Sequence, residues 1–488
     1  MICAKKTFYA CPTGHAPVNP FIGCDFLKNP SGKASENDLG RDRIGRLLLR
    51  LALPSILAQL INALYNIIDR MFIGRIPDIG ATALTGVGVT FPIVMIISAF
   101  SALVGMGGAP RAAIKMGEGK EEEAAGILGN CFALLLGVSA LLTAVFLLFR
   151  DPLLLSFGAS ADTLPYASDY LLIYVSGTVF VQIALGLNPF INAQGFATTG
   201  MTTVLIGAGL NILLDPLFIF GFGMGVRGAA VATILSQAVS AGWVLLFLAG
   251  KRTRLRIRLQ NMRPRSRVLL PVLALGLSPF IMQSTESLVN IALNASLQRY
   301  GGDTAVGAMT ICGSVLQVML MPVTGLTQGA SPIISYNYGA QNVERVKKTF
   351  RLLFFWSVFL STAAWLSLML FPGMYVSIFS EDPALTAKAV WALRIFTGCL
   401  FMLGIQFSCQ QTFVALGQAR TSLLLALLRK IFLLIPLIFL LPCLLSDKVF
   451  AVFLAEPVAD FLAAATTGAV FAIRFKGILA KAERPRPA

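Results

Sequence analysis

The chain has 488 residues, of which 56% are hydrophobic and only 13% are charged, and its formal net charge is +16. Soluble globular domains carry about 25% charged residues, so this composition excludes an ordinary soluble domain and indicates a membrane protein. The positive charge alone suggests nucleic acid as a partner, but its distribution, described below, favours a membrane and no nucleic acid.

Residues 1–38 are the first predicted segment, a disordered cytoplasmic tail or an extension from a doubtful start site. They contain no apolar core of the kind found in a signal peptide. His15, the only histidine, lies here together with Cys3, Cys11 and Cys24. No CxxC spacing is present, so we predict no metal site, no cofactor and no disulfide framework.

Twelve apolar runs follow the tail. A transmembrane helix needs about 20 mostly apolar residues, and each run is long enough. The predicted spans are 47–73, 80–104, 124–148, 166–193, 199–221, 226–249, 268–298, 304–325, 347–371, 386–416, 420–445 and 449–474. The expected fold is an all-α polytopic membrane protein with two six-helix lobes related by a pseudo-twofold axis along the membrane normal.

Basic residues are distributed unevenly between the two sides of these spans. An even number of spans puts both termini on one side. The other side holds only five basic residues in its loops or at the span ends that face it: Arg75, Arg150, Arg227, Arg299 and Lys448. This is the positive-inside bias, so we predict that both termini are cytoplasmic.

The first span carries a polar face. Its polar residues recur at spacings of four and three: Ser55, Gln59, Asn62, Asn66 and Asp69. Such spacing puts them on one side of a helix, and lipid does not tolerate such a side. Tyr65 lies four residues before Asp69 and can approach it. We therefore predict that this face meets protein or water at a functional site.

The fifth span supplies a second carboxylate. Asn211 and Asp215 are four residues apart, and Pro216 follows. Asp69 and Asp215 both lie about 6–9 Å below the outer ends of their spans, which would let them share a proton or hold a cation. Two structural alternatives stay open, an ion pair of Asp69 with Arg70 and a helix-end cap at Asp215.

The loop 251–267 divides the spans into two sets of six. It contains eight basic residues and no acidic one. It could be a nucleic-acid patch, but an anchor on anionic lipid is the interpretation that we favour. The predicted organisation is therefore an N-lobe at 39–250, this linker, a C-lobe at 268–475 and a cytoplasmic tail at 476–488.

The two halves share short patterns at one constant offset of 222 residues. Gly107, Pro110 and Gly117 match Gly329, Pro332 and Gly339. Ala193, Gly195 and Ala197 match Ala415, Gly417 and Ala419 at the same offset. Halves with an even number of spans have the same orientation, so the pattern predicts a parallel duplication.

The seventh span repeats the polar face of the first, with Gln283, Ser287, Asn290 and Asn294. Asn294 falls where Asp69 falls in the first half, which assigns the ion chemistry to the N-lobe. Glu286 remains either a possible C-lobe cation site or a structural partner. For Glu456 and Asp460 in the last span we favour a structural or gating role.

Four stretches in order resemble the multidrug and toxic compound extrusion (MATE) family, in its MepA-like bacterial branch. They are LGRDRIGRLLL at 39–49, LALPSILAQLINALYNIIDRMFIGR at 51–75, NPFINAQG at 188–195 and NILLDPLFIFGFGMGVRGAAVAT at 211–233. The resemblance covers about residues 39–475.

This resemblance implies a monomeric antiporter of the bacterial inner membrane that exports amphipathic organic cations, in exchange for protons or Na⁺, by alternating access. It implies ion coupling by Asp69 and Tyr65 in the YNxxD pattern and by Asn211 and Asp215 in the NxxxDP pattern. The expected substrate cavity has the following polar lining: Gln59, Asn62, Asn66, Asn188, Gln283, Asn290 and Asn294. Residues 386–416 contain no acid, so the C-lobe cation site of some branches lacks its tenth-span member here.

Two other functions would require different residues. A flippase for an anionic lipid-linked precursor would need cationic cavity residues, for which Arg50, Arg394 and Arg429 are candidates, but the acidic N-lobe argues against it. An intramembrane enzyme would need a nucleophile with a base, or metal ligands. The spans contain no histidine and no HExxH or GxSxG pattern, so we predict that the protein is not an enzyme.

Overall fold

The computed structural model describes residues 37–379 and 382–482. The predicted tail therefore lies outside the described residues, except for Asn37 and Asp38. The first half comprises α1 (Ile44–Gly74), α2 (Gly80–Gly117), α3 (Glu121–Leu148), α4 (Arg150–Ser156), α5 (Leu164–Ser176), α6 (Thr178–Ala193), α7 (Ala197–Pro216), the π-helical turn η1 (Leu217–Gly221) and α8 (Val226–Ala249).

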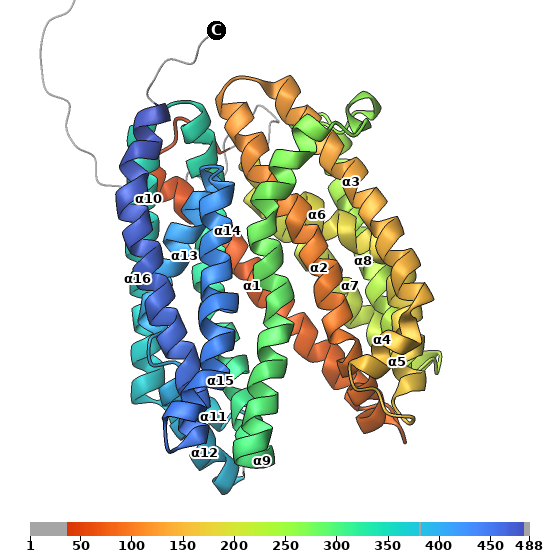
Figure 1. The fold of residues 1–488 in the computed structure, drawn as a ribbon. Helices are drawn as coiled ribbons and strands as arrows, with labels where there is room; N and C mark the ends of the chain where they lie inside the picture. The colour runs from red at the N-terminus through yellow and green to blue at the C-terminus, as the bar shows by residue number, and fades with distance from the viewer. Residues whose placement is uncertain (1–36, 380–381, 483–488) are drawn as a thin grey trace, which may run out of the picture. The chain divides into compact units, whose positions relative to one another are not determined.

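The second half begins after the 3₁₀ turn η2 (Leu259–Met262). It comprises α9 (Ser266–Gly339), α10 (Val343–Leu370), α11 (Pro372–Val376), α12 (Pro383–Phe396), α13 (Leu400–Ala415), α14 (Ala419–Leu427), the π-helical turn η3 (Leu428–Leu434), α15 (Ile435–Leu444) and α16 (Lys448–Ala482). In Figure 1, α10 to α16 gather on one side and α2 to α8 on the other, with α1 and α9 between them.

The described residues contain twelve membrane spans. Nine helices are long and apolar enough to cross a bilayer, and two more spans are bent pairs, α5 with α6 at 58° and α12 with α13 at 48°. The 74-residue α9 holds two spans, because Gly302 interrupts it with φ 65° and ψ −165°, a conformation open mainly to glycine. The predicted number of spans is therefore confirmed.

The offset of 222 residues extends to the helices themselves. When 222 is added to the first and last residue numbers of α3, the result is the first and last residues of α10. The same addition converts the bounds of α6 into those of α13. The starts of α1, α7 and α8 recur at the starts of α9, α14 and α16, and the start of α2 recurs at Gly302. The two halves are thus repeats of one pattern of helices and breaks.

The first helix of each half packs into the other half at its start. Leu47, Leu48 and Leu51 of α1 are buried in a cluster formed mainly by second-half residues such as Ile333. Val272 of α9 is buried in a cluster formed by α2, α3, α6 and α8. The bundle is therefore closed where α1 and α9 begin. We call this the linker end, because residues 251–265 lie there.

The repeated glycines mark these helix crossings. A Cβ on Gly107 would collide with the backbone of Val272 and Gly276, and one on Gly276 would collide with Leu103 O. A Cβ on Gly329 would lie 2.5 Å from the Ala52 nitrogen of α1. Only glycine allows such close backbone approach, so the duplicated motif is explained by contacts between the halves.

A short strap before α1 joins both halves at the linker end. Asn37 Nδ2 donates to Gly195 O of the first half at 3.0 Å. Arg345 Nη2, from the second half, donates to Leu39 O at 3.1 Å and Asp42 O at 2.8 Å. The prediction that Asn37 and Asp38 belong to a disordered tail is therefore wrong for these two residues.

Three helices extend beyond their predicted ends. α2 continues past residue 104 to Gly117, the second part of α9 past residue 325 to Gly339, and α16 past residue 474 to Ala482. The predicted boundaries followed the apolar runs, which stop at small and basic residues. These extensions bury small residues such as Ala109, Ala113 and Ala330 against neighbouring helices, which hydropathy does not reveal.

Candidate functional site

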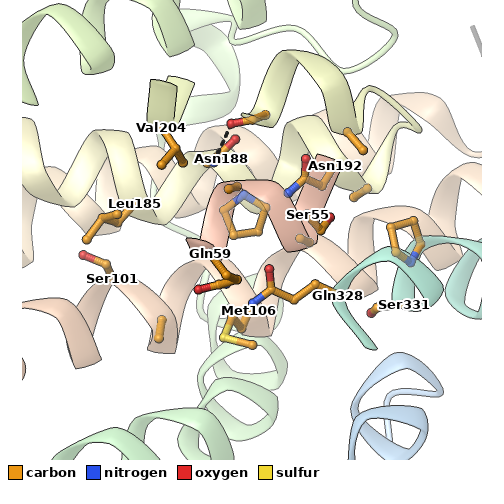
Figure 2. Close-up of a pocket in the computed structure, with 18 of the residues that line it drawn as sticks. Ser55, Gln59, Ser101, Met106, Leu185, Asn188, Asn192, Val204, Gln328 and Ser331 are labelled. Carbon is orange, nitrogen blue, oxygen red and sulfur yellow. Dashed lines mark hydrogen bonds between the residues drawn. The ribbon is translucent and has the colours of Figure 1, made fainter. Parts of the chain in front are cut away.

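A cavity of about 280 Å³ lies between the two halves. Its wall comes from α1, α2, α6, α7, α9 and α13, and Figure 2 shows part of it. The lining side chains that carry a polar group are Ser55, Gln59, Asn62, Ser98, Ser101, Asn188, Asn192, Gln283, Gln328, Ser331 and Gln411. None of the described residues that line it is charged. The cavity therefore offers neutral hydrogen-bonding groups among alanine, proline and methionine side chains.

The structure places the predicted cavity residues in two groups. Four line this cavity: Gln59, Asn62, Asn188 and Gln283. Asn66, Asn290 and Asn294 do not line it; they are exposed farther along α1 and α9, away from the linker end. These three lie outside the cavity because they are one to three helical turns beyond its lining residues Asn62 and Gln283.

Two carboxyl groups meet inside the first half. The side chains of Asp69 on α1 and Asp215 on α7 lie within hydrogen-bonding contact of each other. Asn211 Nδ2 donates to Asp215 Oδ1 at 3.2 Å. Asp69 Oδ1 and Asp215 Oδ2 are buried and have no hydrogen-bond partner among the described residues. Buried acceptors without donors are costly, so this pair is suited to take up a proton or a small cation.

A polar network from α5 and α8 surrounds the carboxyl pair. Asn211 Nδ2 also donates to Thr233 Oγ1 at 3.3 Å, and Thr233 lies close to the hydroxyl group of Tyr170. Tyr170 stacks on Tyr174 with ring centroids 6.0 Å apart. Tyr65 lies close to Asp69 and to Tyr174. The predicted coupling residues are thus brought together, with three further residues from other helices.

A smaller cavity connects this network to the larger one. Tyr65, Asn211 and Thr233 line it together with Asn62 and Asn188. Asn62 and Asn188 line both cavities, so the two cavities share a wall, and Asn211, which bonds Asp215, lines the smaller one. Occupancy of one can therefore affect the other through a shared wall.

The second half contains a group of five charged residues, of which all but Glu286 are buried. Arg429 Nη2 lies 2.7 Å from Asp460 Oδ1 and 3.6 Å from Glu456 Oε1. Lys430 Nζ lies 3.0 Å from Glu286 Oε2. The predicted C-lobe candidate Glu286 is therefore ion-paired with a lysine. Among the described residues, no three His, Cys, Asp or Glu side chains are placed to hold a metal ion.

Sequence reasoning missed several residues of both regions. Tyr170, Tyr174 and Thr233 belong to the carboxyl network, and Asn192, Gln328 and Gln411 belong to the cavity wall. The spacing of Tyr170 and Tyr174 by one helical turn was a usable signal. Gln328 and Gln411 lie among small and polar residues of different helices, and nothing in their spacing indicates a shared cavity.

Comparison with known families identifies the chain. The MatE family model matches residues 54–217 and 279–440, one match in each half. The chain belongs to the MatE family. The two matches correspond to the two structural repeats, and the family resemblance of the sequence motifs is confirmed.

Curated relatives cover most of this MatE protein. The multidrug export protein MepA of Staphylococcus haemolyticus is 27% identical over 423 residues, which are 86% of this chain and 92% of that protein. MepA of Staphylococcus aureus strain MRSA252 is 25% identical over 84% of this chain and 90% of its own length.

Solved structures share the fold. A multidrug resistance MATE family transporter of the MOP superfamily in an outward-facing conformation has a TM-score of 0.84, 24% identity, and coverage of 90% of this chain and 98% of its own. MATE in the bent conformation has a TM-score of 0.85, with 24% identity and coverage of 91% and 98%. The all-α, two-lobe fold predicted from the sequence is thus confirmed.

Proposed function

We propose that this MatE protein is a multidrug efflux antiporter that exports amphipathic organic cations in exchange for protons or Na⁺ by alternating access of its two lobes. The observation that carries the proposal is the contact between the Asp69 and Asp215 carboxyl groups beside a cavity shared by both lobes. The names of the MepA relatives, which are multidrug export proteins, agree with it.

The mechanism is competition between ion and drug across a shared wall. Entry of a proton or Na⁺ at Asp69 and Asp215 neutralises the pair, and this changes its hydrogen bond with Asn211 and its electrostatic interaction with Tyr65. Asn62 and Asn188, which face both cavities, carry this change to the drug site. Ion release restores the state that accepts the drug. The coupling then follows from the different affinities of the two states, as thermodynamics requires.

The cavity lining supports the substrate class. Neutral amides and hydroxyl groups among apolar side chains suit drugs that are large, mostly apolar and singly charged, and the methionines Met106 and Met201 can adapt their shape to different ligands. The alternative flippase would need basic residues to bind an anionic substrate. Arg50, Arg394 and Arg429, the residues considered for that role, do not line the cavity, so the flippase remains the second candidate.

The positive-inside bias supports an orientation with the linker end and both termini in the cytoplasm of a bacterial inner membrane. In that orientation the described conformation is closed to the cytoplasm. We further propose that the transporter acts as a monomer and needs no cofactor besides the coupling ion.

The test is accumulation of ethidium in efflux-deficient bacteria that express the wild type or Asp69→Asn. The expected result is low accumulation with the wild type, and high accumulation with either the substitution or a protonophore. A wild type that ignores the protonophore but requires external Na⁺ would keep the export function and change the ion. A folded, inserted wild type that lowers accumulation of no cation in a broad panel would favour the flippase.

A further inference from the structure

Lys430 and Glu286 form an ion pair whose two members have very different exposure. Their side chains meet at 3.0 Å, but the lysine side chain is 6% exposed and the glutamate side chain 52%. Lys430 approaches from η3, inside the second half. The Glu286 side chain is therefore half-exposed, whereas its ammonium partner is buried.

When all of its side chains are ionised, the group carries one excess negative charge. Arg429 bonds Asp460 through both Nε, at 2.8 Å, and Nη2, at 2.7 Å, and reaches Glu456 only at 3.6 Å. Two cations thus face three carboxylates: Glu286, Glu456 and Asp460. Glu456 is also close enough to Lys430 for their charges to interact. One additional cation would balance the group, and Lys430 has a second carboxylate toward which it can move.

Glu286 lies near the central cavity. It follows Gln283, which lines that cavity, by three residues on α9, and so stands on an adjoining part of the helix surface. A cation that moves one helical turn along α9 from Gln283 would therefore reach the half-exposed side chain of Glu286. Because the lysine already neutralises most of the carboxylate charge, the incoming cation competes with it.

We propose that Lys430 is a specificity-determining residue. It is a tethered ammonium ion that occupies Glu286 from the interior of the lobe and sets how strongly this lobe binds an organic cation. When a cation reaches the half-exposed side chain of Glu286, Lys430 turns toward Glu456 and all three carboxylates are then balanced. The inference rests on the proposed function, since it assumes that organic cations enter the cavity.

The test is whether substitutions of Lys430 and Glu286 change the affinity for an organic cation in opposite directions. Binding of radiolabelled tetraphenylphosphonium to the full-length protein in nanodiscs is measured for the wild type, Lys430→Met and Glu286→Gln. We expect Lys430→Met to bind about tenfold more tightly, because it frees a half-exposed carboxylate, and Glu286→Gln to bind about tenfold more weakly. Lys430→Arg, which retains the charge, is expected to stay near the wild type.

Two further variants separate this role from a structural one. Glu286→Gln/Lys430→Met removes both charges and is expected to bind with an intermediate affinity. Arg227→Met removes a basic partner of the same charge from an exposed ion pair with Asp169, and is expected to leave binding unchanged. Melting temperatures of all variants are measured in parallel, since an unpaired buried charge lowers stability.

The role of Lys430 would be overturned if both single variants changed the affinity in the same direction. It would also be overturned if they lowered the melting temperature and left the affinity unchanged. If the wild type binds the probe but the affinities of Lys430→Met and Glu286→Gln do not shift in opposite directions, only this inference fails. If the wild type, Lys430→Met and Lys430→Arg all bind no organic cation while folded, the proposed function fails as well.

Discussion

The carboxyl group of Asp69 on α1 contacts that of Asp215 on α7, and each leaves one buried oxygen without a hydrogen-bond partner among the described residues. Two carboxylates in contact repel each other when both are ionised, so they act as one site for a proton or a cation. The consequences of this pairing, and of the crossings at the linker end, can be measured.

Because Asp69 and Asp215 act as one site, we predict that the losses of export caused by substituting them are strongly non-additive. Asp69→Asn and Asp215→Asn are each expected to abolish most ion-coupled export, and the double variant to lose no more than either single one, because groups in contact share their interaction energy. Ethidium efflux from preloaded cells gives the rates. Asp169→Asn, which removes an acid from the exposed pair with Arg227, serves as the control. Additive losses would contradict a shared site.

Thr233 connects Asn211 to Tyr170 in the network around this pair. Thr233→Val keeps the shape but removes the hydroxyl group, so we expect the efflux rate to fall by up to about tenfold, as hydrogen bonds are worth about 0.5–1.5 kcal/mol. Thr202→Val on α7, whose hydroxyl group bonds only the backbone of its own helix, is the matched control. Equal rates for the two variants would remove Thr233 from the coupling network.

Closure of the linker end is predicted to depend on the close contact of Gly276 with α2. A methyl group there would collide with Leu103 O of α2, so Gly276→Ala is expected to hold the linker end apart. Spin labels at Glu121 and Lys348 on the two lobes report the distance by double electron–electron resonance. Gly137→Ala, where a Cβ has open space, controls for helix propensity. An unchanged distance distribution in Gly276→Ala would show that closure tolerates the methyl group.

Arg345 stabilises the strap before α1 through its bonds to Leu39 O and Asp42 O. Its replacement by alanine removes the Arg345 donor from Asp42 O, at a cost of about 1–3 kcal/mol, whereas Leu39 O keeps its bond from Asn337 Nδ2. Limited trypsin digestion at Arg41 and Arg43 is expected to become about tenfold faster or more, because cleavage follows local opening. Arg351→Ala, an exposed position on the same helix, is the control. A rate equal to that of the control would mean that Arg345 does not hold the strap.

Periodicity predicted the features that depend on local sequence. Twelve apolar runs determined the number of spans, since a bilayer requires helices of a set length. The polar face that includes Asp69, and the Asn211–Asp215 pair, were visible because residues three and four apart share one side of a helix. The repeat at 222 residues was visible in small residues, although their function at helix crossings was not.

Tertiary structure decided which of these faces meet. Asp69 and Asp215 belong to helices distant in sequence, and only the packing of α1 against α7 brings their carboxyl groups together. The pairing of Glu286 with Lys430, and the place of Gln328 in the cavity wall, depend likewise on long-range packing. The sequence by itself determined the spans, the duplication and the polar stripes, because these follow from hydropathy and helical period. The partners across helices were decided by packing, which no local spacing encodes.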